Sequence, residues 1–141
     1  MTASERPDIA WADTNLFVSL FAEAAHPLHN QALRLFRRVA DGSLRLIVTP
    51  VVIAELVHVT ESLFDWQRSQ SARRLGDLVA ADGLDVREAA VLSQALDRYG
   101  ARRRLDFVDA YLAASALTAG PPTVASLDRD FDRIDGVRRV S

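Results

Sequence analysis

A short apolar segment that ends at an acidic residue constrains the fold more than any other part of this sequence. Residues Ile9–Ala12 are apolar and of strand length, Asp13 follows directly, and residues 16–21 change to a helical pattern. A buried strand that leads into a helix is typical of α/β proteins, in which ligands bind beyond the carboxyl ends of the strands. Asp13 is therefore either part of a functional site or a cap for the following helix, and this segment alone leaves both open.

Short apolar segments alternate with helical patterns along the rest of the chain. Further strands are predicted over 44–48, 84–86, 123–126 and 137–140, and further helices over 27–39, 50–62, 65–81, 88–99 and 107–119. This alternation predicts an α/β fold in which a parallel sheet is covered by helices on both faces. The length of 141 residues, without a linker or an internal repeat, predicts a single domain over residues 1–141.

The composition excludes several classes of protein. All 17 basic residues are Arg, and the chain has neither Lys nor Cys. Lysine-dependent phosphate loops, Schiff bases, thiolate nucleophiles, cysteine zinc sites and disulfides are therefore excluded. A net charge of −2 argues against a strongly basic nucleic-acid protein but allows a local basic patch. Because no segment resembles a membrane span or a secretory signal, we expect a soluble, cytoplasmic protein.

Acidic residues lie next to apolar neighbours in four segments of the chain. They are Asp13, Glu55, Asp106, Asp109, Asp128 and Asp130. Glu55, within V-V-I-A-E-L-V, is expected near a buried face, where an unpaired charge is costly. Asp13 and Asp128 follow strands and are expected to meet at one edge of the sheet. Clustered carboxylates favour a bound cation, and oxygen ligands suit Mg²⁺ or Mn²⁺, which promote phosphodiester hydrolysis.

Other interpretations of these acids are less consistent with the sequence. The segment Asp13–Asn15 resembles the start of an aspartyl-phosphate phosphatase motif, but Asn15 stands where that motif needs a second Asp, and its lysine is absent. Helix capping or loop solvation is the main alternative for Asp106 and Asp130, whereas it fits Glu55 poorly.

Four motifs, taken together, make the chain resemble a known family. They are A-D-T-N at Ala12–Asn15, T-P-V-V-I-A-E-L at Thr49–Leu56, D-F-V-D-A-Y-L-A-A at Asp106–Ala114 and V-A-S-L-D-R-D-F at Val124–Phe131. In this order and spacing they cover nearly the whole chain. They resemble the motifs of PIN-domain ribonucleases, and among these the VapC-type toxins of bacterial type II toxin–antitoxin systems.

The resemblance implies a fold, an activity and partners. The fold would be a three-layer α/β/α PIN-like domain around a central, mostly parallel sheet of four to five strands. The activity would be that of an endoribonuclease that depends on Mg²⁺ or Mn²⁺. The partners would be RNA as substrate, a second copy in a homodimer, and a small antitoxin whose C-terminal segment covers the acidic groove.

The resemblance also assigns roles to individual residues. The places of the family's catalytic and metal-binding acids are taken by Asp13, Glu55, Asp109 and Asp128, with Asp106 and Asp130 as possible further ligands. Asp109 is preferred to Asp106 because it occupies the family's acidic position just before the small residues Ala113 and Ala114. The expected supporting residues are Thr14 and Asn15, which would orient Asp13, and Ser126, where the family often has Thr.

Basic and aromatic residues add candidates for substrate binding. Arg102, Arg103 and Arg104 precede the Asp106 segment and could hold RNA phosphates, and a solvated loop is the alternative. His58 lies one turn after Glu55 and could approach the site. The sequence thus predicts a metal-dependent endoribonuclease toxin whose metal-activated water leaves 3′-hydroxyl and 5′-phosphate ends. The alternative is a non-catalytic PIN-like module that binds RNA or protein, against which four intact acids argue.

Overall fold

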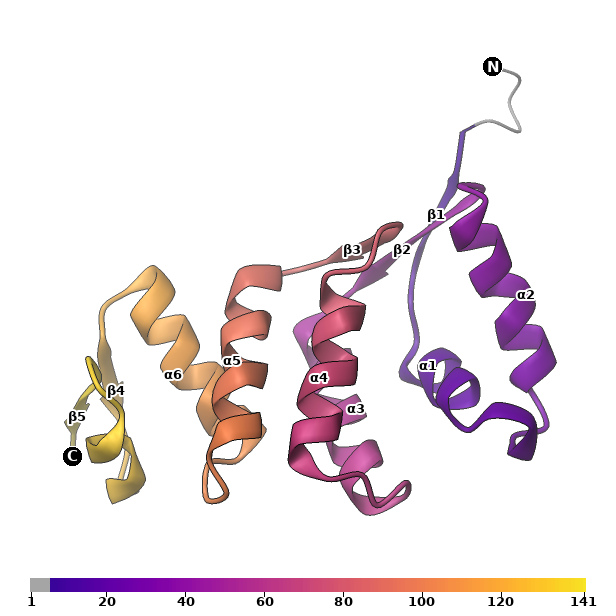
Figure 1. Ribbon diagram of the computed structural model, residues 1–141. Helices are drawn as coiled ribbons and strands as arrows, with labels where there is room; N and C mark the ends of the chain where they lie inside the picture. Colours follow the sequence, from indigo (N-terminus) through magenta and orange to yellow (C-terminus); the bar gives the residue numbers. More distant parts are fainter. Residues whose placement is uncertain (1–5) are drawn as a thin grey trace.

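The computed structural model describes residues 6–141, so residues 1–5 of the predicted domain lie outside the described residues. Strands alternate with helices as predicted (Figure 1). The strands are β1 (Asp8–Trp11), β2 (Leu44–Val48), β3 (Leu84–Val86), β4 (Thr123–Ala125) and β5 (Arg138–Val140). The helices are α1 (Thr14–Phe21), α2 (His29–Ala40), α3 (Pro50–Ser62), α4 (Arg68–Val79), α5 (Ala89–Ala101) and α6 (Phe107–Ala119), with short 3-10 helices η2 (Glu23–Ala25) and η3 (Arg129–Arg133).

The start of α3 shows how local sequence sets the helix boundaries. The side chain of Thr49 accepts a hydrogen bond of 3.3 Å from the backbone N–H of Val52, and Pro50 occupies the first helical position. Both features favour helix initiation, because one satisfies a free N–H and the other has a fixed helical φ. The predicted beginning of this helix is therefore confirmed.

The strands form two parallel sheets. The first has the order β1-β2-β3 and the second pairs β4 with β5, with every pairing parallel. The predicted α/β class is confirmed, and helices packed on parallel strands are consistent with the three-layer α/β/α fold of a PIN domain. The predicted strands are divided between two sheets, because β4 and β5 lie at the opposite end of the molecule from β1 (Figure 1).

The two faces of the first sheet differ in burial. Leu46 and Val48 point to one face and belong to the main hydrophobic core, on which Ala10 also packs. Ile9 and Trp11 point to the opposite face and are 65% and 67% exposed. One face of the first sheet is therefore packed, whereas the other presents apolar side chains to solvent.

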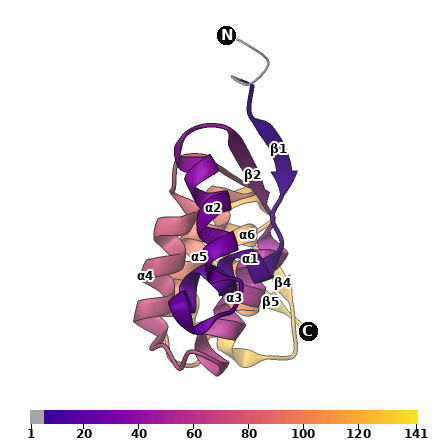
Figure 2. The same cartoon turned by 90° about the vertical axis from the view of Figure 1, so that its right-hand side faces the viewer.

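The main core joins the first sheet to the helices between the two sheets. Its largest fully buried apolar side chains are Phe17, Ile53, Leu56, Leu75, Leu92, Leu96 and Tyr99. In the end-on view of Figure 2 these helices lie behind and beside α1 and α2. Burying a side chain of this size contributes about 1.5–3 kcal/mol, so this cluster supplies most of the stabilisation of the fold.

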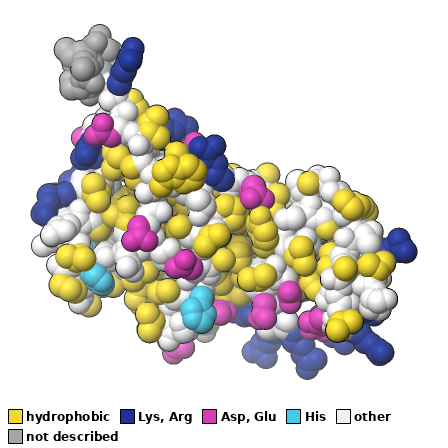
Figure 3. Space-filling view, turned by 180° about the vertical axis from the view of Figure 1, so that it is seen from behind, with side chains coloured by type: hydrophobic (Ala, Val, Ile, Leu, Met, Phe, Trp, Pro, Cys, Tyr) yellow, Lys and Arg dark blue, Asp and Glu magenta, His cyan; other side chains and the backbone are white. Residues whose placement is uncertain are grey.

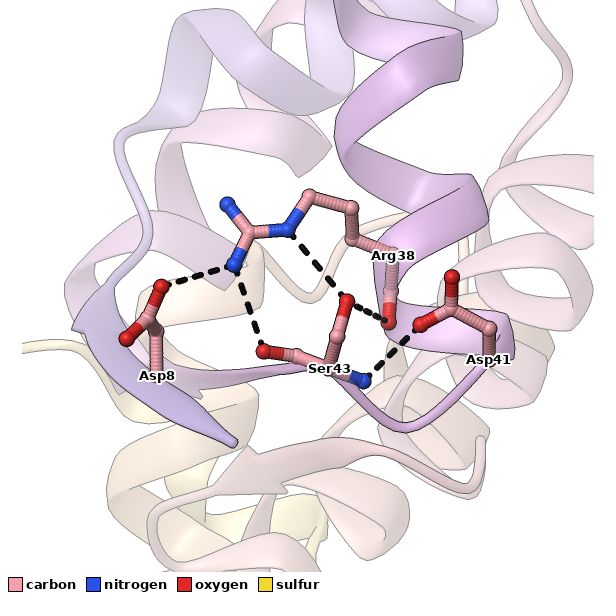
Figure 4. Close-up of polar contacts among 4 residues, drawn as sticks. All are labelled: Asp8, Arg38, Asp41 and Ser43. Atoms are coloured by element: carbon pink, nitrogen blue, oxygen red, sulfur yellow. Dashed lines mark hydrogen bonds and ion pairs between the residues drawn. The ribbon is translucent and has the colours of Figure 1, made fainter. Parts of the chain in front are cut away.

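Polar contacts fix β1 beside the turn between α2 and β2 (Figure 4). The Arg38 guanidinium donates to the Asp8 carboxylate at 2.7 Å and to the Ser43 carbonyl at 3.3 Å. The Ser43 N–H donates to the Asp41 carboxylate at 2.9 Å, and hydrogen bonding by the Ser43 side chain, followed by this backbone bond, lowers the pKa of Asp41. These bonds hold β1 on the side that faces β2. The other edge of β1 has no strand partner in the part of the chain that the structure describes.

No helix within residues 6–141 has both the length and the apolar character needed to cross a membrane.

Candidate functional site

Acidic residues from α6 and from the segment after β4 gather at one end of the molecule. The pKa of Asp109 is raised, first by partial burial and then by the negative charges of Asp106, Asp128 and Asp130. Asp106 precedes α6 and makes no capping bond with its side chain, so capping does not explain it. We call these four residues the acidic cluster. Its mutual repulsion makes it a place where positive charge would bind favourably.

Hydrogen bonds position the part of the acidic cluster that follows β4. The Ser126 hydroxyl accepts from the Asp128 N–H at 3.0 Å, and an Asp128 carboxylate oxygen accepts from the Asp130 N–H at 2.8 Å. Arg139 donates to the Ser126 carbonyl at 3.0 Å and binds both carboxylate oxygens of Asp132 at 2.9 and 3.2 Å. This ion pair lowers the pKa of Asp132. Ser126 thus contacts the Asp128 backbone, and its supporting role stays a prediction.

A basic groove adjoins the acidic cluster. It has a volume of about 230 Å³ and is lined by Arg102, Arg103, Arg104, Leu105, Asp130 and Arg133. Arg102 donates to the Arg133 carbonyl at 3.0 Å, which fixes one arginine across the groove. Figure 3 shows acidic side chains next to arginines at this end of the molecule. The three predicted arginines therefore lie beside the acids, in a position suited to a polyanion.

A cleft of about 490 Å³ separates α3 from the beginning of α6. It is lined by Ala54, Val57, His58, Glu61, Asp106, Phe107, Val108 and Asp109. His58 is thus near the acidic cluster, as its position in the sequence suggested. Glu61 is a further carboxylate that the sequence analysis did not identify. Its spacing of three residues from His58 places both on the same side of α3, and this spacing could have indicated that Glu61 lines the cleft.

Glu61 is held by the buried Tyr99 and the half-buried Arg68. The Tyr99 hydroxyl donates to its carboxylate, and the guanidinium of Arg68 lies 3.7 Å from the same carboxylate and 4.0 Å from the centre of the Tyr99 ring. Burial, followed by Glu61, raises the pKa of Tyr99. These contacts explain Glu61 as a structural residue at the wall of the cleft.

Asp13 follows β1, as predicted, with only Ala12 between them, at the end of the first sheet. It is exposed at the beginning of α1, and its side chain makes no capping hydrogen bond. Thr14 is buried and Asn15 is exposed, and among the described residues neither side chain donates or accepts a hydrogen bond with Asp13. Helix capping therefore does not account for Asp13, and its expected orientation by Thr14 and Asn15 stays a prediction.

The expected burial of Glu55 is wrong. Glu55 is exposed on α3, whose buried face is formed by Val52, Ile53, Leu56 and Val57. Val51, four residues before Glu55, is also 65% exposed, so an apolar sequence run did not mean an apolar environment. The solvent-facing side of α3 carries both residues because an α-helix repeats every 3.6 residues.

The donor chemistry and the geometry of the acids differ in what they imply for a metal ion. Carboxylate oxygens are suitable ligands for Mg²⁺ or Mn²⁺. Within residues 6–141, however, no three His, Cys, Asp or Glu side chains are arranged so that they could hold one ion. Asp13 and Asp128 follow strands of different sheets, so the structure does not bring them to one edge of a sheet as the sequence predicted.

Comparison with known proteins identifies the family. The family model described as PIN domain matches residues 11–137, which include β2, β3, β4, the helices α1 to α6 and the acidic cluster. No curated protein and no solved structure matches the chain. PIN domains are generally nucleases that use divalent metal ions. Because the match extends over nearly the whole sequence, the chain belongs to the PIN domain family.

Proposed function

We propose that this PIN domain is an endoribonuclease and the toxin of a toxin–antitoxin pair. The observation that carries the proposal is the position of the arginine groove beside the acidic cluster. Phosphodiester hydrolysis needs positive groups that bind the backbone and carboxylates that act at the scissile phosphate. Both kinds of group lie at one end of this molecule.

The proposed roles follow the chemistry of each group. Asp13, Glu55, Asp109 and Asp128 are the functional carboxylates, and Mg²⁺ or Mn²⁺ is the cofactor that such hard oxygen ligands prefer. Asp106 and Asp130 keep the charge of the cluster negative beside them. Arg102, Arg103 and Arg104 hold the phosphates that flank the cleavage point.

A cleavage assay tests the enzymatic part. Purified protein is incubated with total cellular RNA and Mg²⁺ or Mn²⁺, and the Asp128→Asn variant is compared with wild type. The amide keeps the oxygen that accepts from Asp130 N–H but removes the charge, so cleavage should fall by about 100-fold or more. Asp97→Asn, on the exposed side of α5, is the matched control and should cleave normally. Equal cleavage by wild type and Asp128→Asn would overturn the assignment, and RNA binding without cleavage would favour the non-catalytic module.

The arginine groove makes a separate prediction about binding. Arg103→Gln should weaken RNA binding, and the slope of log K against log salt should drop by about 0.7, because one RNA phosphate is no longer neutralised. Arg73→Gln, exposed on α4, is the control and should leave the slope unchanged. A slope that does not respond to Arg103→Gln would mean that the groove does not bind the backbone.

The toxin role needs evidence from cells. Expression of the wild-type chain in the bacterial cytoplasm should slow growth, whereas Asp128→Asn should not. Co-expression of a small protein encoded beside the gene should restore growth and bind the acidic end of the chain. Unimpaired growth on expression of an active nuclease would refute the toxin role alone.

A further inference from the structure

Four strands lie at sheet edges among the described residues, β1 and β3 in the first sheet and β4 and β5 in the second. β1 pairs only with β2, and β4 pairs only with β5. An unpaired edge presents free backbone N–H and C=O groups that can pair with another strand. Because all pairings in both sheets are parallel, a parallel pairing of β1 with β4 would continue the existing pattern.

Apolar surface is exposed beside the free edges of β1 and β4. Ile9 and Trp11 project from β1 on the open face of the first sheet. On α6, Val108 and Leu112 lie four residues apart, so they share one side of the helix, and they are 66% and 43% exposed. A groove of about 340 Å³ continues from Leu112 between α6 and β4. In Figure 3 hydrophobic side chains extend across the face between the two ends of the molecule.

A second copy of the chain fits these surfaces best. In one chain, α5 and α6 separate β4 from β1 (Figure 1), so the two edges do not meet. Each chain carries one of each surface, so a reciprocal exchange between two copies would cover all of them.

We propose that two copies exchange their C-terminal units, defined as α6, β4, η3 and β5. The β4 strand of one copy pairs with β1 of the other, and its α6 covers Ile9 and Trp11. Asp13 at the end of β1 then lies beside Asp128 of the second copy, after the end of β4. Each catalytic site is completed by acids from two chains. This assignment of the site rests on the proposed nuclease function, but the strand exchange does not.

Cysteine cross-linking tests the exchange without any activity measurement. The chain has no natural cysteine, so Ile9→Cys in a tagged chain and Thr123→Cys in an untagged chain give unique reaction points at the starts of β1 and β4. The two chains are unfolded and refolded together, then treated with a short thiol cross-linker. The expected product is a covalent pair of one tagged and one untagged chain. Asp97→Cys replaces Ile9→Cys as the control and should not cross-link.

A single chain that carries both Ile9→Cys and Thr123→Cys distinguishes exchange between two copies from closure within one chain. A cross-link found only inside single molecules, with none in the mixture, would overturn the proposal and show that the two sheets of one chain join. The absence of both products would overturn it as well.

Mixed variants test the shared site. Asp13→Asn and Asp128→Asn chains, each inactive alone, are refolded together. About one quarter of wild-type activity should return, because half of the dimers are mixed and one of the two sites in each then holds only intact acids. No recovery, in a mixture that cross-links, would refute the shared site and leave the exchange standing. An inactive wild type would refute the proposed function instead, while the cross-link still reports on the exchange.

Discussion

Removing the charge of Asp109 should stabilise the fold while it abolishes function. Asp106 lies three residues away, just before α6, and Asp128 and Asp130 act from the segment after β4. Each like-charge neighbour at a partly exposed site costs about 0.2–0.5 kcal/mol. The three together cost about 1 kcal/mol, so Asp109→Asn should raise Tm by about 3 °C near neutral pH.

Partial burial, and after it the three neighbouring negative charges, raises the pKa of Asp109, and this sets the direction of the pH dependence. In the folded state the carboxyl binds its proton more tightly than in the unfolded chain, so wild-type stability falls as pH rises through this range. The advantage of Asp109→Asn should therefore be full above the folded pKa and disappear below the ordinary value of 3.8. Salt at about 0.5 M should reduce it by screening. Thermal unfolding at several pH values measures the effect, with Asp97→Asn as control. A variant less stable than wild type at neutral pH, or a gain independent of pH, would refute the repulsion.

Two further predictions concern the parts that hold the site. Thr60 and Ser71, both fully buried, share a hydrogen bond of 2.8 Å between α3 and α4. Thr60→Val should therefore lower the free energy of unfolding by about 1–3 kcal/mol, because the Ser71 hydroxyl is left unpaired. The double variant Thr60→Val with Ser71→Ala should recover most of that stability in urea unfolding. Arg139→Leu removes the bonds to Asp132 and to the Ser126 carbonyl, and hydrogen exchange should become faster in β4 and β5 while the first sheet keeps its protection.

Local chemistry made much of the fold predictable from the sequence. The Thr49–Pro50 pair determined where α3 begins, and Asp13 was placed correctly after β1, because both depend on neighbours within a few residues. The same holds for Asp106 and Asp109, whose spacing on a helix was enough to place them near each other.

Long-range pairing was not predictable in the same way. Apolar strands such as residues 123–125 carry no information about which edge they join, so one sheet was expected where the described residues form two. Glu55 was misjudged because an apolar run on a helix includes its exposed side. Glu61 was missed because its partners Tyr99 and Arg68 come from other helices.

The balance between apolar burial and charge repulsion decides how the acids of this chain come together. Pairing β1 with β4 would bring Asp13 towards Asp109 and Asp128, and each such pair costs about 0.2–0.5 kcal/mol while it remains partly solvated. The same pairing would bury Ile9 and Trp11, which are now 65% and 67% exposed. Complete burial of a large apolar side chain is worth about 1.5–3 kcal/mol, so covering both residues outweighs the repulsion. Apolar burial therefore offsets the repulsion among the acids, and that repulsion gives the assembled site its preference for positive charge.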